Sequence, residues 1–366
     1  MRTLIQKLKK MILVLLALVA GGMLLLFLLL LLYSPGKPAP LKDKNGKPPA
    51  GSISEKVFVE IGGVRQGMFI RGKSLNNPVL LYLHGGMPDY FLTPRYPVVL
   101  EEYFTVVWWE QRWAGMSYHP GTRPEAITPE QLISDTRELT NYLRGRFGQE
   151  KIYLLGRSGG SFFGIQAAAR FPELYHAYIG IGQMSDQLHS ERLAYQYMLD
   201  SYRLAGDVGM VRRLEACPVT NHIPAAYLRV RDQAMHRIGV GTTRAMRSVV
   251  SGMFIPSLTF KEYTLKEKFN LWRGKAAAGV HPLWESILAT DLSRQVNRAE
   301  IPVHFLHGRY DYTVSYTLAK HYFEVFQAPE KAFFTFEHSA HSPHFEEPER
   351  VREVLERILK GRVGED

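Results

Sequence analysis

A serine lies between closely spaced glycines in the segment GRSGG, residues 156–160. The apolar run IYLLG (152–156) precedes it and a helical pattern follows it, which predicts a sharp turn from a buried strand into a helix. Such a turn projects the hydroxyl of Ser158 at the carboxyl end of the strand, where the N–H of Gly159 and the helix dipole stabilise negative charge on a substrate oxygen. Ser158 is therefore a candidate nucleophile, and a plain glycine-rich turn is the alternative.

A serine hydroxyl attacks carbonyls well only when a general base takes its proton and an acid orients that base. On a sheet of this kind the acid and then the base follow the serine along the chain. Asp311 comes just after the apolar run VHFLHG (303–308), where a loop residue reaches the same sheet edge as Ser158. Asp186, after the run HAYIGIG (176–182), is the main competing acid, and a turn-forming role is the alternative for Asp311.

Three candidates for the base, His338, His341 and His344, follow the run AFFTF (332–336). We choose His341 because it lies at the centre of the loop and leads the run HSPHFEEP (341–348). His338 and His344 are then loop or pocket residues. A metal site is the rival hypothesis for three close histidines, but they lack the i, i+4 spacing of ligands on a helix. We therefore expect no metal site.

Two glycines in the segment HGGMP (84–88) follow a further apolar run, PVLLYL (78–83). Glycines after a strand let a backbone N–H approach a substrate oxygen closely. The loop at Gly86, together with the N–H of Gly159, would complete an oxyanion hole. A plain strand-ending turn is the alternative.

The elements that must position these residues are short apolar strands that alternate with helices. Expected strands are a hairpin over 55–61 and 64–71 and the runs 78–83, 104–109, 152–156, 176–182, 303–308 and 332–336. Expected helices cover 129–147, 159–171, 315–326 and 347–360. This alternation predicts an α/β fold with a mostly parallel sheet covered by helices on both faces.

Residues 185–300 interrupt the alternation, because they are rich in Met, Arg and Tyr and show helical patterns without a convincing strand. We expect them to form a helical cap inserted into a core made of residues 51–184 and 301–366.

Residues 11–32 contain no charged residue and are almost entirely apolar. A helix of that length is about 33 Å long and crosses the hydrocarbon core of a bilayer. A cleaved signal peptide is the alternative, but cutting after Ala20 would leave twelve mostly apolar residues on the mature chain. We expect residues 1–32 to be a basic segment with an uncleaved transmembrane signal anchor, and residues 33–50, with five prolines and four lysines, to be an extended, solvated linker.

The formal net charge of the 366 residues is +10, and seven of these charges precede residue 51. The remaining chain has no dense run of Lys or Arg, so we expect no nucleic-acid partner. Lys7, Lys9 and Lys10 directly flank the apolar span, which places the N-terminus in the cytoplasm and the large domain outside a single-pass cell membrane anchor. The single cysteine, Cys217, excludes an intramolecular disulfide and a zinc site built on several thiolates.

Four segments resemble the α/β-hydrolase superfamily and, within it, the branch of the prolyl aminopeptidases (proline iminopeptidases). HGG at 84–86 is similar to that branch's HGGPG loop, EQRWAGMS at 110–117 to its DQRGxGxS block, and GRSGGS at 156–161 to GGSWGS. HSPHFEEPE at 341–349 resembles the GHxPxxExPE ending of the superfamily and supports His341 as the base. This chain departs from the branch in the loop, where HGGPG becomes HGGMP (84–88), and at Glu110 for Asp, Trp113 for Gly and Gly159 for Trp.

The resemblance implies an α/β-hydrolase fold with an inserted cap and a serine hydrolase without a cofactor. Ser158, Asp311 and His341 would form the catalytic triad and a covalent acyl-enzyme, with the N–H groups near Gly86 and of Gly159 as the oxyanion hole. The substrate would be a small molecule or a peptide, the latter as for a prolyl aminopeptidase.

Two alternatives stay open: a carboxylesterase or lipase acting on apolar acyl esters, and, outside enzymes, an anchored pseudoenzyme or binding module. Prolyl aminopeptidases hold the free amino group of the substrate with carboxylates of the cap. The cap acids considered for this role are Glu191, Glu215, Glu262 and Glu285. A cap acid that faces Ser158 would favour the peptidase, and a purely apolar pocket would favour the esterase.

Overall fold

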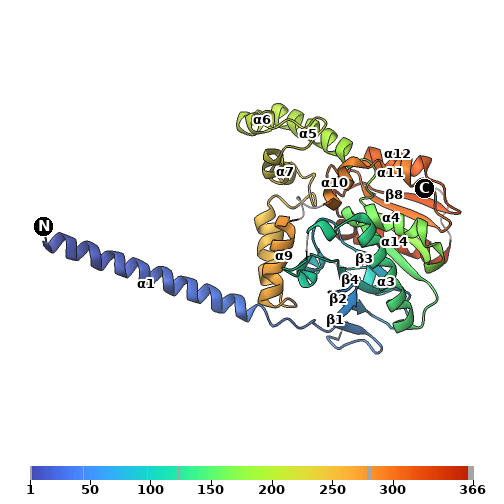
Figure 1. Cartoon of the computed structure of the whole chain (residues 1–366), viewed down its shortest axis with the longest axis horizontal. Helices are drawn as coiled ribbons and strands as arrows, with labels where there is room; N and C mark the ends of the chain where they lie inside the picture. Colours follow the sequence, from blue (N-terminus) through green and yellow to red (C-terminus); the bar gives the residue numbers. More distant parts are fainter. Residues whose placement is uncertain (1, 44, 97, 123, 278–281, 362–366) are drawn as a thin grey trace.

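One mixed sheet forms the centre of the molecule (Figure 1). The computed structural model describes residues 2–361 except 44, 97, 123 and 278–281, and the last residues of the expected core, 362–366, lie outside the described part. In the described residues the sheet has eight strands in the order β1-β2-β4-β3-β5-β6-β7-β8. Their bounds are β1 (Ile53–Ile61), β2 (Val64–Gly72), β3 (Val79–Leu83), β4 (Thr105–Glu110), β5 (Ile152–Arg157), β6 (Tyr175–Ile181), β7 (Val303–Gly308) and β8 (Lys331–Phe336).

The strand directions place the site-bearing loops at one edge of the sheet. β1 pairs with β2, and β2 with β4, in antiparallel fashion, whereas all neighbours from β4 to β8 are parallel. The loops that follow β3, β5, β7 and β8 therefore emerge from the same edge, where ligands of α/β sheets bind. The expected strands and the mostly parallel sheet are confirmed, with ends that shift by one or two residues.

Helices cover both faces of the sheet. α3 (Pro129–Phe147), α4 (Gly159–Arg170) and α12 (Tyr316–Val325) contribute to one apolar cluster, and α14 (Pro348–Lys360) contributes to the other. α3 has the bounds that the sequence predicted: the Thr128 hydroxyl accepts the N–H of Gln131 at 3.1 Å, and Gly148, at φ 62°, ends the helix.

The chain between β6 and β7 is helical. It forms α5 (Gln187–Leu204), α6 (Val208–Glu215), α7 (Ala225–Arg237), the π-helical turn η5 (Val250–Phe254), α8 (Ile255–Thr259), α9 (Leu265–Ala277), α10 (Pro282–Ala289) and α11 (Leu292–Gln295). We call this helical part the cap. Helices α5, α6 and α7 share an apolar cluster of their own, whereas Tyr263 and Leu271, before and in α9, pack into the core cluster. The cap is thus attached to the core through α9 and also through α10 and α11, whose Ile287 and Leu292 belong to the other core cluster.

The first helix, α1 (Arg2–Leu32), stands away from the rest of the molecule (Figure 1). The most apolar 18-residue window of its segment Leu4–Leu32 has a mean hydropathy of 3.0 and is not covered by the protein, so by length and composition the helix is able to cross a membrane. The chain after α1 is tied to the cap, because Pro35 forms a β-bridge with Thr264 and the N–H of Gly36 donates to Lys261 O at 3.1 Å.

Candidate active site

Ser158 occupies the sharp turn between β5 and α4. Its backbone has φ 53° and ψ −125°, a conformation that costs about 1–3 kcal/mol for a residue other than glycine. The Ser158 N–H donates to Ile181 O at 2.9 Å, which fixes the turn against β6. A Cβ atom on Gly160 would overlap the carbonyl oxygens of Leu83 and His84, so only glycine lets α4 start this close to β3. The strained turn is held in place by its neighbours.

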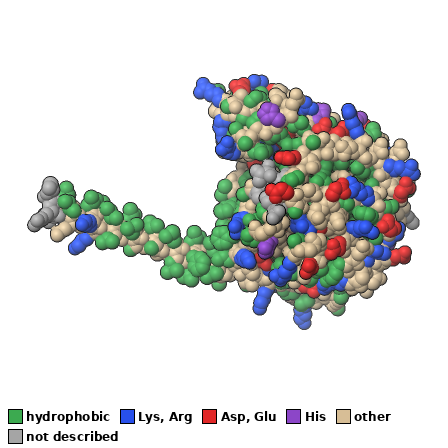
Figure 2. All heavy atoms as spheres, in the orientation of Figure 1, with side chains coloured by type: hydrophobic (Ala, Val, Ile, Leu, Met, Phe, Trp, Pro, Cys, Tyr) green, Lys and Arg blue, Asp and Glu red, His purple; other side chains and the backbone are tan. Residues whose placement is uncertain are grey.

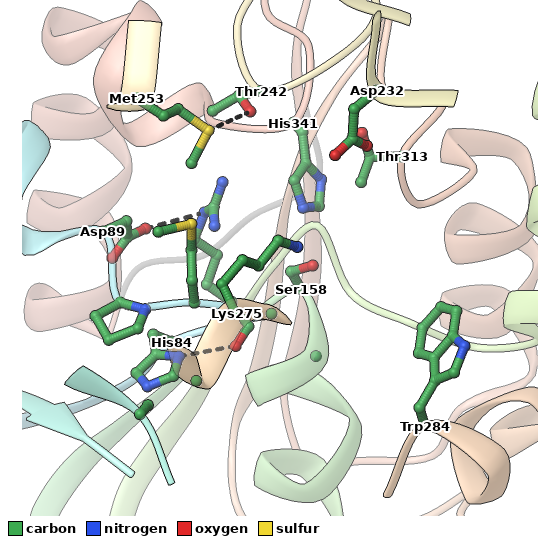
Figure 3. Close-up of a pocket in the computed structure, with 18 of the residues that line it drawn as sticks. His84, Asp89, Ser158, Asp232, Thr242, Met253, Lys275, Trp284, Thr313 and His341 are labelled. Atoms are coloured by element: carbon green, nitrogen blue, oxygen red, sulfur yellow. Dashed lines mark hydrogen bonds and ion pairs between the residues drawn. The ribbon is translucent and has the colours of Figure 1, made fainter. Parts of the chain in front are cut away.

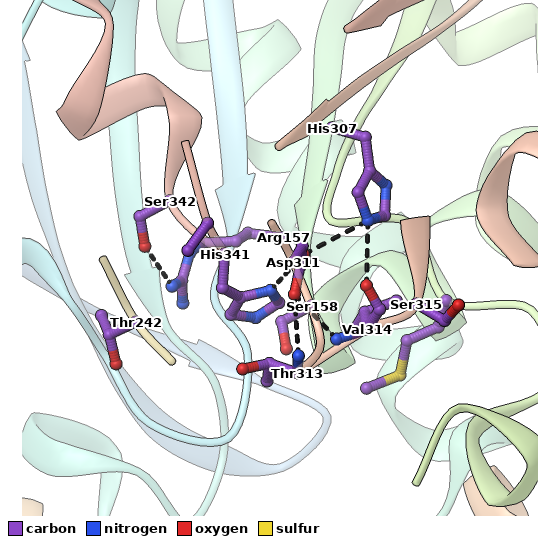
Figure 4. A network of polar contacts seen from close by, with 12 residues as sticks. Arg157, Ser158, Thr242, His307, Asp311, Thr313, Val314, Ser315, His341 and Ser342 are labelled. Atoms are coloured by element: carbon purple, nitrogen blue, oxygen red, sulfur yellow. Dashed lines mark hydrogen bonds and ion pairs between the residues drawn. The ribbon is translucent and has the colours of Figure 1, made fainter. Parts of the chain in front are cut away.

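His341 and Asp311 come together beside this serine (Figure 4). Asp311 lies in the loop after β7, and His341 lies in the loop between β8 and the short helix α13 (Pro343–Glu346). The Nδ1–H of His341 donates to Asp311 Oδ2 at 2.7 Å. In the described residues no hydrogen bond joins the Ser158 hydroxyl to the imidazole; such bonds are often long before substrate binds.

Four donors surround the carboxylate of Asp311. Oδ1 accepts the N–H groups of Thr313 and Val314, both at 2.9 Å, and Oδ2 accepts His341 and lies 3.2 Å from His307 Nε2. Burial alone would raise the pKa of Asp311, but His341 and His307 outweigh it and hold that pKa well below its ordinary value. The carboxylate is therefore ionised and able to stabilise an imidazolium.

Burial lowers the pKa of His341 below its ordinary value of 6.5, and Asp311 opposes this effect only in part. The imidazole is therefore neutral at physiological pH. With Nδ1–H committed to Asp311, Nε2 is left as the proton acceptor, which is the protonation state that a general base needs.

The loop after β3 faces the serine and is held by His84. Its Nδ1–H donates to Gly85 O at 2.7 Å, and its Nε2 accepts the N–H of Gln111 at 3.3 Å. Burial lowers the pKa of His84 to about 3, so the ring stays neutral and keeps this tautomer. A Cβ atom on Gly85 would lie 2.7 Å from Ser158 Cβ, so the loop approaches the serine only because residue 85 is glycine.

The amides of Gly86 and Gly159 lie close together on the two sides of the serine. A Cβ atom on Gly159 would lie 3.8 Å from the Gly86 nitrogen. Within the described residues neither N–H has a hydrogen-bond acceptor. Lys275 Nζ would lie 3.7 Å from a Cβ atom on Gly86, which adds a positive charge next to this pair. The arrangement suits an oxygen that gains negative charge.

Arg157, the residue before the serine, connects the two site loops. Its Nη2 donates to Ser342 Oγ at 2.7 Å, and its Nε forms an ion pair with Asp89 Oδ2 at 3.3 Å. The hydroxyl of Tyr82 donates to the same carboxylate oxygen at 2.8 Å, and His344 is buried beside it. His344 therefore lies in the wall behind the site.

The rival candidates occupy other positions. Asp186 caps α5, where its side chain accepts the N–H of His189 at 2.9 Å. His338 is exposed, and its backbone N–H donates to Glu347. No group of three or more His, Cys, Asp or Glu side chains among the described residues is placed to hold a metal ion.

A cavity of about 460 Å³ opens above Ser158 and His341, between the core and the cap (Figure 3). Its walls are largely apolar and include Trp113, Met253, Trp272 and Trp284. Trp113 stands where the prolyl aminopeptidase block has glycine, and it keeps the left-handed backbone that favours glycine, with φ 72°. It lines the cavity, and its buried Nε1–H has no hydrogen-bond partner within the described protein.

Of the four cap acids that the sequence suggested, only Glu191 lines the cavity. The carboxylate of Glu191 accepts hydrogen bonds from Nη2 and Nε of Arg231 at 2.6 and 2.7 Å. Glu215 pairs with Arg203, Glu262 accepts the hydroxyl of Tyr90, and Glu285 is exposed away from the cavity lining.

Asp232 is the cavity acid that sequence reasoning missed. It lies on α7, lines the same cavity as Ser158, and its side chain is 46 % exposed although it pairs with Arg231 at 3.0 Å. Burial raises the pKa of Asp232, but Arg231 and Lys275 outweigh this and lower it, so the group is ionised. Nothing in the helical pattern of residues 225–237 marks this position, because its orientation is set by the packing of α7.

Comparisons with known proteins agree with this geometry. The family model described as "alpha/beta hydrolase fold" matches residues 78–348. A Bacillus subtilis (strain 168) protein named "Probable aminopeptidase YbaC" is 30% identical over 319 residues, which cover 85% of this chain and 98% of that protein.

Solved structures show the same fold. A proline iminopeptidase-related protein from Thermus thermophilus superposes with a TM-score of 0.59 at 18% identity, covering 85% of this chain and 99% of that one. The proline iminopeptidase of Mycobacterium smegmatis superposes with a TM-score of 0.56 at 17% identity, covering 84% of this chain and 98% of that one. The chain therefore belongs to the α/β-hydrolase family, is a hydrolase enzyme, and resembles the prolyl aminopeptidases.

Proposed function

We propose that this protein is a membrane-anchored serine aminopeptidase. The observation that carries the proposal is the 2.7 Å bond between His341 Nδ1 and Asp311 Oδ2 beside a serine in a strained strand–helix turn. This arrangement is the one that acyl transfer through a serine nucleophile requires.

In the proposed reaction Ser158 Oγ attacks the carbonyl carbon of the substrate while His341 Nε2 takes the hydroxyl proton. The N–H groups of Gly86 and Gly159 hold the oxyanion, and Lys275 adds positive charge beside them. His341 then gives its proton to the leaving amine, and an acyl-enzyme remains on Ser158. A water molecule, deprotonated by His341, attacks the ester carbonyl, and Ser158 regains a proton as the acid is released.

Asp232 supports a peptidase over an esterase. An ionised carboxylate in the cavity suits the protonated amino group of a peptide N-terminus, whereas an acyl ester offers it no partner. The relative named as an aminopeptidase points the same way. The large apolar part of the wall is the observation that favours the second candidate, a carboxylesterase of apolar acyl groups.

A fluorophosphonate probe tests the nucleophile. We expect labelling of the wild type and of Ser201→Ala, a cap control on α5, and none of Ser158→Ala. Equal labelling of Ser158→Ala, or an unlabelled wild type, would contradict the mechanism and favour a pseudoenzyme.

Asp232→Asn tests the substrate class. We expect kcat/KM for aminoacyl aryl amides to fall roughly ten- to a hundredfold, because a charge-assisted contact is lost. The matched cap variant Asp200→Asn, exposed on α5, should keep the wild-type value. If Asp232→Asn changes aryl amides and simple acyl esters equally, Asp232 does not bind the amino group.

The proposed topology places α1 in the cell membrane and the catalytic domain outside the cytoplasm, in line with the three lysines at residues 7–10. Protease added to intact cells should then degrade residues 51–366. Degradation only after lysis would reverse the orientation.

A further inference from the structure

The outer surface of the cap next to α1 exposes large apolar side chains. Val250 and Phe254 of η5, Ile255 of α8 and Phe269 of α9 are 60, 40, 51 and 59 % exposed. We call these four residues the apolar cap face. Phe254 packs edge-on against Trp272 with ring centroids 5.1 Å apart, and Trp272 lies about one turn from Phe269 on α9. The two helical segments therefore present one shared surface.

This face adjoins the point where α1 joins the body. The ammonium of Lys268, in α9, donates at 2.5 Å to Tyr33 O, just after α1, and at 2.5 Å to Leu258 O in α8. The two helical segments of the face and the end of α1 thus meet at one side chain. Figure 2 shows the hydrophobic side chains of α1 continuing into hydrophobic side chains along the adjoining edge of the body.

The charges around the face have one sign. Between residues 244 and 274, every exposed charged residue is basic: Arg247, Lys261, Lys266 and Arg273. The two acids of this stretch, Glu262 and Glu267, are buried. Exposed apolar side chains with a basic surround are the pattern of a surface that lies in the headgroup region of an anionic bilayer.

We propose that the apolar cap face is a second membrane contact, which lies in the interface of the same bilayer that α1 spans. The inference rests on the proposed membrane anchor and goes beyond it, because a transmembrane anchor holds a protein at the bilayer without a further contact. The occupant is the lipid bilayer, since the face is continuous with the apolar helix and its exposed charges complement anionic headgroups.

The contact would place one wall of the active-site cavity at the lipid surface. Val249, Met253 and Trp272, from the same helical segments, line the cavity that holds Ser158. A substrate that partitions into the headgroup layer would therefore meet the cavity wall directly. The structure thus assigns the cap two surfaces, an outer one for lipid and an inner one for substrate.

Single-cysteine variants of the full-length protein in nanodiscs test this contact. An environment-sensitive fluorophore is attached at Phe269→Cys or Ile255→Cys, at Leu16→Cys inside α1, and at Asn141→Cys on α3 as the water-exposed reference, all with Cys217→Ser. We expect blue-shifted emission and quenching by doxyl-labelled lipids at positions 269, 255 and 16, and neither at position 141.

The outcomes separate the inference from the anchor. Water-like emission at 269 and 255 with a lipid-quenched probe at 16 would overturn the cap contact and leave the anchor intact. A water-exposed probe at 16 would overturn both. The double variant Lys266→Gln/Arg273→Gln should reduce the quenching at 255 in anionic nanodiscs, whereas Lys320→Gln on α12 should not; equal quenching in the two variants would contradict the role of the basic residues.

Discussion

At the scale of residues, the candidate triad was predictable because each member has a strong local context. Ser158 lies in a glycine-flanked turn after an apolar run, and Asp311 and His341 follow apolar runs in the expected chain order. The groups that support them were not predictable, since His84 and His307 act through contacts that form only in the folded chain. Asp232 was missed for the same reason.

His307 is a positioning residue for the triad, because its Nε2 lies 3.2 Å from Asp311 Oδ2 and 3.0 Å from Val314 O. Burial is the main effect that lowers the pKa of His341, and His307 adds to it, so we expect His307→Phe to raise that pKa and to move the acid limb of kcat/KM to higher pH. The loss of one polar contact to Asp311 should lower kcat/KM by a few-fold to about tenfold.

A pH profile of kcat/KM measures this effect. His304→Phe is the control, because His304 is equally buried in β7 and does not contact Asp311. The acid limb of the control should coincide with that of the wild type. Superposed limbs for the two variants would show that His307 does not act through Asp311.

At the scale of elements, strands and core helices were predictable because their patterns are strong and their ends carry recognisable caps. The cap was predictable as helical but not in its arrangement. Helix packing decides that Glu191 is engaged by Arg231 while Asp232 faces the cavity. The contact between core and cap at Glu110 was also not predictable from the sequence. Glu110, at the end of β4, accepts hydrogen bonds from the hydroxyl of Tyr263 in the cap and from the N–H of Met116, and these partners come together only in the folded chain.

Glu110 makes the stability of this contact between core and cap dependent on pH. Burial raises its pKa from 4.5 to about 8, against the effect of its two donors, so the folded protein keeps this carboxyl protonated at neutral pH. A carboxyl group whose pKa is raised on folding stabilises the folded protein fully at pH values below its unfolded pKa. This contribution is lost progressively as the pH rises from 4.5 to about 8.

We therefore expect the Tm of the wild type to fall more steeply than that of Glu110→Gln as the pH rises from 4.5 to about 8, and the two slopes to become similar above that pH. Thermal unfolding followed by circular dichroism checks this. Glu60→Gln, on the exposed surface of β1, should keep the wild-type slope. Parallel slopes for wild type and Glu110→Gln would show that Glu110 is ionised throughout.

At the scale of the whole molecule, the sequence predicted an apolar span and a solvated linker but not how the two join the body. Lys268 is buried, although a lysine in an amphipathic helix is ordinarily expected to be exposed. Its two carbonyl partners, Tyr33 and Leu258, come from segments far apart in the chain. The direction of α1 relative to the cap therefore depends on a contact that no local pattern encodes.

Lys268→Met tests that contact. The apolar side chain keeps much of the lysine volume but leaves the carbonyls of Tyr33 and Leu258 without their donor, which costs about 1–3 kcal/mol of folding stability where the carbonyls stay buried. We expect a lower Tm and a looser attachment of α1. Spin labels at Leu32→Cys and Asn141→Cys, in the Cys217→Ser background, should give a narrow distance distribution in the parent protein and a broad one with Lys268→Met. Lys266→Met, exposed on the same helix, should leave the distribution narrow. Narrow distributions in both variants would mean that the backbone contacts of Pro35 and Gly36 with the cap orient α1 without Lys268.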